Sequence, residues 1–300
     1  MQQKTVIIIA GPTAVGKTAA GIAVANHFGA EIISADSRQC FKELRIGVAR
    51  PSADELAQVP HHFIASHSIH QKVTAATFEA YALEKAAQLF QTNNVVVMVG
   101  GTGLYIKAFC EGMDEIPEVS EAVHQEVITN YRQQGLPWLQ EEMQKADPRF
   151  WQEGETQNPQ RMMRALEVAK ATGRSIFDFQ KGEKKQREFS VIKLAIDRPK
   201  EQLHQNINHR VDAMMEEGLV EEVKSLLPYK HLNALQTVGY KEVFSYLDGT
   251  MTLQQATDAI KQATRQYAKR QLTWFRKDKE YHWLPPEPAV ILPFLEQQLP

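Results

Sequence analysis

A complete P-loop pattern carries the clearest chemistry in the sequence. It reads Gly11-Pro12-Thr13-Ala14-Val15-Gly16-Lys17-Thr18 and directly follows the apolar run at residues 6–10. In such a loop, successive backbone N–H groups line a turn, and a helix begins with its positive dipole end facing that turn. Lys17 supplies a point charge to phosphate oxygens, and the Thr18 hydroxyl can reach Mg²⁺. The pattern predicts a site for a polyphosphate or pyrophosphate, and leaves open whether that group is transferred, hydrolysed or expelled.

Asp36 is the second residue whose position points to chemistry. It follows the short apolar strand predicted at residues 31–35, beside the P-loop. A carboxylate there can hold Mg²⁺ as a Walker-B-type ligand, or it can accept a proton from an incoming nucleophile. The apolar run 95–99 ends in Gly100-Gly101-Thr102-Gly103 instead of an acid, which argues against an ordinary ATPase. The residues alone leave both roles of Asp36 open.

Several basic side chains are candidates for binding phosphate groups. Arg161 and Arg164 share one helical face, although Glu167 can neutralise Arg164, and a surface ion pair is the favoured interpretation. Arg210 lies among apolar neighbours and either reaches a phosphate or extends to water.

A second basic group follows a helical stripe near the C-terminus. Its members are Arg265, Lys269, Thr273 and Arg276, and the opposite face of the same predicted helix is apolar. A helix with a core side and a basic side suits binding to a nucleic-acid backbone.

The bulk composition excludes few classes of function. The chain has 300 residues, 43% of them hydrophobic, and 34 basic against 36 acidic side chains give a formal charge of −2. The longest apolar runs, 6–10 and 95–99, have the length of strands, so we expect neither a membrane span nor a signal peptide. Cys40 and Cys110 are isolated and suggest reduced thiols in a cytoplasmic protein.

The elements that must position these residues alternate as in a doubly wound parallel sheet. We expect strands at 6–10, 31–35 and 95–99, with helices at 18–27 and 77–90. Ligands bind at the carboxyl ends of strands in such sheets. The P-loop, Asp36-Ser37 and the glycine-rich turn 100–103 should therefore line one crevice.

The pattern changes near Gly112. From there to about Ser190 the chain is polar and helical, with one helix expected at 160–171, and a strand at 191–196 then returns to the sheet. More helices follow, and prolines at 285–288 predict a loop before a short tail. We therefore predict a core of residues 1–112 and 190–300, interrupted by a helical insertion at 113–189.

The sequence resembles the bacterial tRNA dimethylallyltransferases, or tRNA isopentenyltransferases of the IPP transferase family, nearly from end to end. The segments that carry the resemblance are the P-loop at 11–18, Ser-Ala-Asp-Ser-Arg-Gln at 34–39, Ile46-Gly47 with Pro51, Pro-His-His at 60–62, Gly-Gly-Thr-Gly-Leu-Tyr at 100–105, Gln-Arg-Met-Met-Arg-Ala-Leu-Glu at 160–167, Val-Gly-Tyr-Lys-Glu at 238–242, and residues 264–271 with Thr273-Trp274. The resemblance implies an α/β, P-loop NTPase-like core with an inserted helical domain and C-terminal helices.

The resemblance also implies a reaction. A dimethylallyl group passes from dimethylallyl diphosphate to N6 of adenine 37 in tRNA, giving N6-(dimethylallyl)adenosine and pyrophosphate. The P-loop would then hold a departing pyrophosphate and not ATP. Lys17 and Mg²⁺ would stabilise its developing charge. The aspartate that matches Asp36 would take the proton of the weakly nucleophilic amine, and the adenine would leave its stack to react.

The family's site residues carry over by position. The implied catalytic residues are Asp36, Thr102 and Lys17, and Thr18 would hold the metal. The diphosphate would contact Gly11, Pro12, Thr13, Ala14, Val15, Gly16, Lys17, Thr18 and Arg210. The anticodon stem-loop would contact Asp36, Ser37, Arg38, Gln39, Thr102, His124, Gln160, Arg161, Met162, Met163, Arg164, Gln236, Thr237, Val238, Gly239, Tyr240, Lys241, Lys269, Arg270, Gln271, Thr273, Trp274 and Arg276. The insertion would clamp the anticodon loop, and the protein would act as a monomer.

Among the departures from the family pattern, the one at His124 bears on tRNA binding, and two alternative functions stay open. His124 stands where the family often has Arg, and a neutral imidazole contributes less to phosphate binding. A small-molecule P-loop kinase would share the opening motif and the sheet, but would leave the basic helix near the C-terminus unexplained. An RNA-binding P-loop protein without transferase activity is the third hypothesis.

Overall fold

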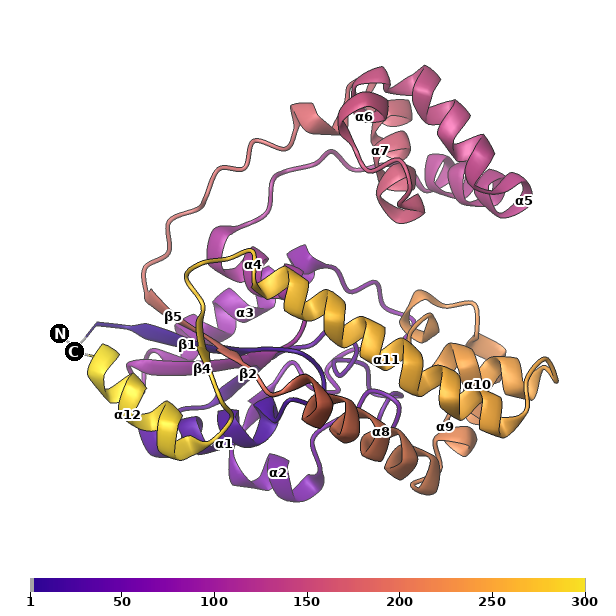
Figure 1. The fold of residues 1–300 in the computed structure, drawn as a ribbon. Helices are drawn as coiled ribbons and strands as arrows, with labels where there is room; N and C mark the ends of the chain where they lie inside the picture. The colour runs from indigo at the N-terminus through magenta and orange to yellow at the C-terminus, as the bar shows by residue number, and fades with distance from the viewer. Residues whose placement is uncertain (1–2, 300) are drawn as a thin grey trace. The chain divides into compact units, whose positions relative to one another are not determined.

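A six-stranded, entirely parallel sheet forms the centre of the chain, and the computed structural model describes residues 3–299 (Figure 1). The strand order is β3-β2-β4-β1-β5-β6. The strands are β1 (Thr5–Ala10), β2 (Ile32–Ala35), β3 (His61–His62), β4 (Val95–Gly100), β5 (Ser190–Ile196) and β6 (His282–Leu284). Continuous runs of Val and Ile suit central strands that are buried on both faces. The predicted doubly wound, P-loop NTPase-like α/β core is confirmed.

Helices cover both faces of this sheet. In Figure 1, α1 and α12 lie on one face and α3 and α4 on the other. Ile7 and Ile9 of β1 pack toward α1 and α12, because successive side chains of a strand point to opposite faces. The helices around the sheet are α1 (Lys17–Phe28), α2 (Ala53–Gln58), α3 (Ala75–Leu89), α4 (Gly103–Glu111), α8 (Lys200–Glu216), α9 (Leu219–Ser225), α10 (Tyr240–Leu247), α11 (Leu253–Phe275) and α12 (Pro288–Gln298), with short 3₁₀ turns at Leu227–Tyr229 and Asn233–Leu235.

The chain divides into two compact units. The core unit comprises the residues up to Glu111 and those from Gln186 onward, and the helical unit is Gly112–Lys185. The helical unit contains α5 (Glu121–Ala146), α6 (Pro148–Glu153), α7 (Pro159–Thr172) and a 3₁₀ turn at Ile176–Asp178. Gly135 adopts a non-helical conformation inside α5, so this element is two helical segments joined at a kink.

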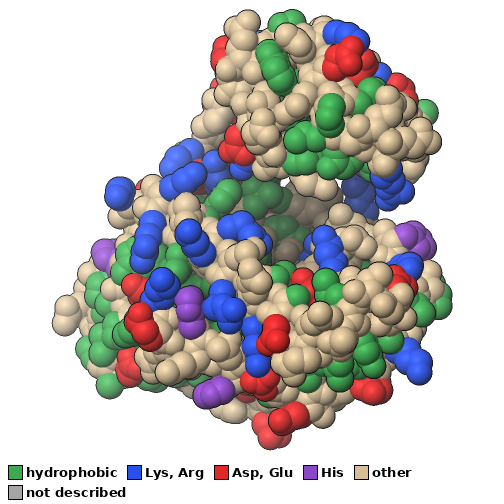
Figure 2. All heavy atoms as spheres, turned by 45° about the vertical axis from the view of Figure 1, so that its right-hand side comes forward, with side chains coloured by type: hydrophobic (Ala, Val, Ile, Leu, Met, Phe, Trp, Pro, Cys, Tyr) green, Lys and Arg blue, Asp and Glu red, His purple; other side chains and the backbone are tan. Residues whose placement is uncertain are grey.

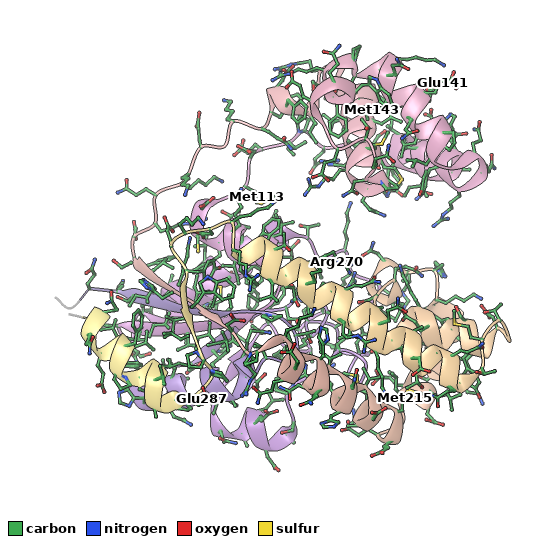
Figure 3. All side chains as sticks on the ribbon, in the orientation of Figure 1. Met113, Glu141, Met143, Met215, Arg270 and Glu287 are labelled. Atoms are coloured by element: carbon green, nitrogen blue, oxygen red, sulfur yellow. The ribbon has the colours of Figure 1, made fainter. Side chains whose placement is uncertain are left out.

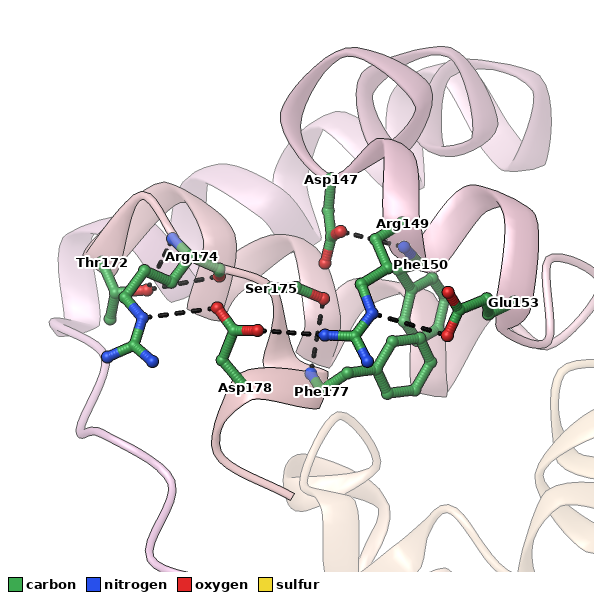
Figure 4. Close-up of polar contacts among 9 residues, drawn as sticks. All are labelled: Asp147, Arg149, Phe150, Glu153, Thr172, Arg174, Ser175, Phe177 and Asp178. Carbon is green, nitrogen blue, oxygen red and sulfur yellow. Dashed lines mark hydrogen bonds and ion pairs between the residues drawn. The ribbon is translucent and has the colours of Figure 1, made fainter. Parts of the chain in front are cut away.

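The helical unit has a hydrophobic core of its own. Val127, Leu139, Met143 and Phe150 pack there against the buried side of α7, and Figure 3 shows Met143 within this unit. Polar contacts also join its helices and turns, both inside and at the surface (Figure 4). The Asp147 carboxylate accepts a hydrogen bond from the Phe150 N–H at 2.9 Å and so caps α6. Two arginines, Arg149 and Arg174, both bind Asp178.

The C-terminal segment differs from the prediction of a loop and a short tail. Residues Pro288–Gln298 form α12, which packs on α1 through the buried side chains of Ile291 and Leu295. Proline is tolerated in the first turn of a helix, so Pro288 does not prevent this helix from starting. The short edge strands β3 and β6 also escaped prediction, because two or three residues carry too little periodicity. No helix in residues 3–299 is both long and apolar enough to cross a bilayer.

Candidate active site

The P-loop joins the end of β1 to the start of α1. Gly16 precedes α1 with φ of 107°, a left-handed conformation that favours glycine, and it has no side chain that could cap the first N–H groups of the helix. Other elements support the loop from behind. The Arg198 Nε donates to the Val15 carbonyl at 2.9 Å, and the Asn206 amide donates to the Ala14 carbonyl at 3.1 Å.

Two cations meet over this loop. The Lys17 Nζ donates to the Pro12 carbonyl at 2.6 Å, and the Arg210 guanidinium donates to the Thr13 hydroxyl at 3.2 Å. Burial, together with the charge of Arg210, lowers the pKa of Lys17 to about 7. Burial also lowers the pKa of Arg210. A dianionic or trianionic group placed between them would relieve this repulsion. Of the two possibilities for Arg210, a phosphate site or the solvent, the structure shows the first direction: its side chain turns toward the P-loop.

The three predicted strand ends do converge. The Thr102 N–H donates to the Ala35 carbonyl at 3.1 Å, and the Thr102 hydroxyl accepts a hydrogen bond from the Ser37 N–H, also at 3.1 Å. Asp36 lies at the start of the turn after β2, where its Oδ1 accepts hydrogen bonds from the N–H groups of Arg38 at 2.8 Å and Gln39 at 3.2 Å. Neither bond uses Oδ2, which leaves the second carboxylate oxygen available to a substrate.

One cleft of about 1180 Å³ contains the P-loop and these strand ends. Its walls come from β2, the segment 45–53, α8, the segment 236–241 and α11. Such a volume accommodates an allylic diphosphate together with a purine base, and it lies at the carboxyl ends of the parallel strands, where ligands bind in open α/β sheets. The residues that line the cleft include Thr13, Lys17, Thr18, Asp36, Gln39 and Arg210.

Gln271 joins α11 to the P-loop. Its side-chain oxygen accepts a hydrogen bond from the Thr13 N–H at 2.9 Å, and its Nε2 donates to the Gly101 carbonyl at 2.9 Å. The residue is only 7% exposed. Its amide therefore holds the P-loop against the glycine-rich turn after β4, which is a different role from the tRNA contact predicted for it.

The exposed face of α11 carries basic and aromatic side chains. Lys269, Arg270, Thr273 and Trp274 line a shallow depression there together with Gln266 and Lys277. Arg276 is exposed at the end of the helix. Figure 2 shows Lys and Arg side chains on the visible face of the core unit, and Figure 3 places Arg270 on α11. The predicted basic stripe thus faces solvent, except for Arg265, which donates to Asn208 Oδ1 at 2.7 Å.

Comparison with known proteins identifies the family. The family model described as IPP transferase matches residues 39–278. A protein of Flavobacterium johnsoniae named tRNA dimethylallyltransferase is 46% identical to the chain, over 93% of each. Another from Bacteroides thetaiotaomicron, named tRNA dimethylallyltransferase 1, is 43% identical over 98% of this chain and 96% of that protein. The chain belongs to the IPP transferase family.

Solved structures agree with this assignment. The full-length tRNA isopentenylpyrophosphate transferase from Bacillus halodurans superposes with a TM-score of 0.72 at 32% identity, covering 99% of this chain and 97% of that one. A eukaryotic dimethylallyltransferase described as acting on tRNA gives a TM-score of 0.76 at 25% identity, covering 98% of this chain and 77% of that one. The resemblance stated from the sequence is confirmed, and these findings favour a tRNA prenyltransferase over the small-molecule kinase.

Some of the residues that the family resemblance predicts as tRNA contacts are buried in this chain. Met162 is 0% exposed and Met163 8%, and both belong to the core of the helical unit. Tyr240 is 0% exposed and donates from its hydroxyl to Glu222 at 2.6 Å. The side chains of these three residues are therefore packed in the protein interior, and the tRNA contact predicted at these positions stays a prediction. Their motifs place some side chains on the outer face of a helix and others, one or two positions away, in the core.

Other predicted contacts of the helical unit lie at its surface. Gln160 and Arg161 are exposed, and Arg161 pairs with Glu155. Arg164 forms the expected ion pair with Glu167, with 3.6 Å between nitrogen and oxygen. The Glu167 side chain is only 7% exposed and also contacts His124 Nδ1 at 2.8 Å, so His124 is turned toward this carboxylate.

In the core unit, the remaining predicted contacts lie at or near the cleft. Gln236, Thr237, Val238, Gly239 and Lys241 line it. Arg38 lines it too, although its guanidinium donates to the carbonyls of Asn233 at 3.0 Å and Ala234 at 3.2 Å. The roles of Arg198, Asn206 and Glu222 escaped prediction, since a lone polar residue in a loop or on a helix carries no signal of what it will meet.

The donor set of the cleft fits Mg²⁺ that arrives with a diphosphate. The Thr18 and Asp36 side chains both line the cleft. Among residues 3–299 no group of three or more His, Cys, Asp or Glu side chains is gathered as a metal site. Mg²⁺ often takes one or two protein oxygens plus substrate phosphates and water, which matches this sparse set.

Proposed function

We propose that the protein transfers a dimethylallyl group from dimethylallyl diphosphate to N6 of adenine 37 in tRNA, releasing pyrophosphate. The observation that carries this proposal is one cleft with two unlike ends. Lys17 and Arg210 lie over the P-loop at one end, and the Asp36 carboxylate lies at the neighbouring strand end. The first set suits a diphosphate leaving group, and the second suits a nucleophile that must lose a proton.

The P-loop end would stabilise the leaving group. Breaking an allylic C–O bond places negative charge on the departing pyrophosphate, and donors already aimed at that position lower the barrier most. Lys17, Arg210 and the N–H groups at the start of α1 supply such donors. Thr18 would hold Mg²⁺, which when bound would supply further positive charge to the leaving group. The P-loop would thus serve an expelled pyrophosphate, with no nucleotide needed.

Asp36 would act as the general base. Its Oδ1 is occupied by the N–H groups of Arg38 and Gln39, which hold the carboxylate in place. The free Oδ2 would accept a proton from the adenine amine as the new C–N bond forms. Thr102, bonded to the turn that carries Asp36, would contact the same base. Because the same free Oδ2 would be needed for the proton, we assign the metal to Thr18 and not to Asp36.

The substrate tRNA would bind across surfaces of both units. The exposed α11 side chains, from Lys269 to Arg276, would contact phosphates, and the segment 236–241 would contact the anticodon arm. The helical unit would clamp the anticodon loop through exposed residues such as Arg161. Adenine 37 would flip out of its stack to reach the cleft. We further propose that the protein works as a monomer in the cytoplasm.

Nucleoside analysis tests the proposal directly. Unmodified tRNA incubated with the protein, dimethylallyl diphosphate and Mg²⁺ should yield N6-(dimethylallyl)adenosine by mass spectrometry, and Asp36→Asn should bind the same tRNA without turnover. Phosphate transfer from labelled ATP to a small molecule, with no prenylated adenosine, would refute the proposal. Unchanged turnover of Asp36→Asn would refute the base assignment alone.

A further inference from the structure

Glu222, on α9, makes an unusual set of hydrogen bonds with a distant part of the chain. Its Oε2 accepts from the N–H groups of Arg45 at 3.2 Å and Ile46 at 2.8 Å. Its Oε1 accepts from the Gly47 N–H at 3.1 Å and from the Tyr240 hydroxyl at 2.6 Å. Three successive N–H groups and one hydroxyl therefore converge on a single carboxylate. Bonds to a charged acceptor are stronger than those between neutral groups.

The segment bound by Glu222 is a wall of the cleft. We call residues 45–50 the wall loop, and all of them line the cleft. Tyr240 closes the back of this loop. A Cβ atom added at Gly47 would lie 2.6 Å from the Tyr240 ring, so only glycine lets the backbone approach so closely. Glu222 and Tyr240 thus join the wall loop to the C-terminal helices.

The wall loop is held in a strained conformation. Ala49 has φ of 48°, in the left-handed region that residues with a Cβ rarely adopt. Such residues persist only where their surroundings overdetermine the backbone. Arg50 donates to the carbonyls of Phe41 at 2.7 Å and Lys42 at 2.9 Å and also contacts that of Leu44, which binds the loop from its other side.

A chain of hydrogen bonds connects the wall loop to Asp36. The Gln39 amide donates to the carbonyls of Val48 at 3.2 Å and Ala49 at 2.8 Å. The backbone N–H of the same Gln39 donates to Asp36 Oδ1. A shift of the wall loop would therefore move Gln39 and the turn that orients the Asp36 carboxylate. The P-loop is supported by other residues, among them Gln271, Arg198 and Asn206.

We infer that Glu222 is a positioning residue. It holds the wall loop, and through that loop Gln39 and Asp36, at the end of the cleft that would receive the adenine, which we call the acceptor side. It does not support the P-loop end of the cleft, which would hold the diphosphate and which we call the diphosphate side. The inference rests on the proposed function, because it assigns Asp36 to the acceptor. It deepens that function by separating the residues that position the adenine from those that position the leaving group.

Glu222→Gln is the principal test, with Glu221→Gln as its matched control. Glutamine has the same shape, but one of its two terminal atoms becomes a donor and faces N–H or O–H groups that also donate. Glu221 is exposed on the same helix. We expect kcat with saturating tRNA and dimethylallyl diphosphate to fall on the order of 10- to 100-fold in Glu222→Gln, the loss that a small misplacement of a reacting group produces. The Kd for pyrophosphate should stay within about twofold, given that shifts below roughly 0.4 kcal/mol are small on the affinity scale. Glu221→Gln should match the wild type.

A second variant, Tyr240→Phe, keeps the inference falsifiable if Glu222→Gln folds poorly, and hydrogen–deuterium exchange tests the wall loop directly where Glu222→Gln folds. Tyr240→Phe removes only the 2.6 Å bond and keeps the ring, so it should give a smaller loss of kcat in the same direction. Hydrogen–deuterium exchange of the amides of Arg45, Ile46 and Gly47 should accelerate in Glu222→Gln and not in Glu221→Gln, whatever the activity.

The outcomes separate this inference from the proposed function. A wild-type protein that makes no prenylated adenosine would overturn the proposed function. An active wild type with unchanged kcat in both Glu222→Gln and Tyr240→Phe would overturn the role of Glu222. A parallel loss of pyrophosphate affinity would also overturn it, since Glu222 would then support the whole cleft and not its acceptor side.

Discussion

We expect replacement of Arg210 by methionine to weaken the binding of diphosphate. The loss of affinity should be larger than any loss of folding stability can explain. The Arg210 guanidinium lies over the P-loop, where it donates to the Thr13 hydroxyl at 3.2 Å and where its charge contributes to the lowered pKa of Lys17. Methionine keeps most of the apolar stem between the neighbours of Arg210 on α8. The substitution therefore removes the charge and its donors with little change in packing.

The magnitude follows from the kind of bond that is lost. A hydrogen bond to a charged group contributes about 1.5–3 kcal/mol. One such bond from Arg210 to the diphosphate therefore corresponds to a roughly 10- to 150-fold rise in Kd. The lost repulsion on Lys17 acts in the opposite direction, because Lys17 then holds its proton more readily. The observed change should lie toward the lower end of that range.

Titration calorimetry with pyrophosphate and with dimethylallyl diphosphate, in the absence of tRNA, measures this effect. Arg265→Met is the matched control, since Arg265 is also an arginine bonded to a neighbouring polar side chain, Asn208, but does not line the cleft. Its affinity for diphosphate should equal that of the wild type. Equal affinities of Arg210→Met and the wild type would refute the placement of the leaving group between Lys17 and Arg210.

Three further predictions address the helical unit, the α11 surface and the metal. Met162→Ala should destabilise the helical unit by about 2–5 kcal/mol in urea unfolding, as other buried large-to-small substitutions do. Gln160→Ala, at an exposed position, should have little effect on stability. A Met162→Ala variant as stable as the wild type would contradict the place of Met162 in the core. Lys269→Gln should reduce the slope of log affinity for tRNA against log salt by about one, and an unchanged slope would exclude a phosphate contact there. Removal of divalent ions with EDTA should stop dimethylallyl transfer, and added Mg²⁺ should restore it. Transfer that persists in EDTA would contradict the assignment of Thr18 as a metal ligand.

Much of the fold was predictable because its signals are local. The strands β1 and β4 are uninterrupted apolar runs, and the P-loop needs only its own residues and the strand before it. The C-terminal helix α12 was missed for a local reason as well, since Pro288 and Pro293 weaken the helical pattern while its apolar face becomes meaningful only against α1. Local patterns predict an element well when they do not depend on the partner that it packs against.

The site divides in the same way. The sequence by itself determined the P-loop, the carboxylate at Asp36, the basic face of α11 and the family, because residue type and spacing along one segment suffice for each. Only the tertiary structure decided that Arg210 turns to the P-loop, that Gln271 braces it, and that Glu222 holds the wall loop. It also decided that Met162 and Tyr240 are buried while their motif neighbours face solvent. The physical reason is that burial and hydrogen-bond partners depend on segments far away in the chain, which no spacing within a single segment can specify.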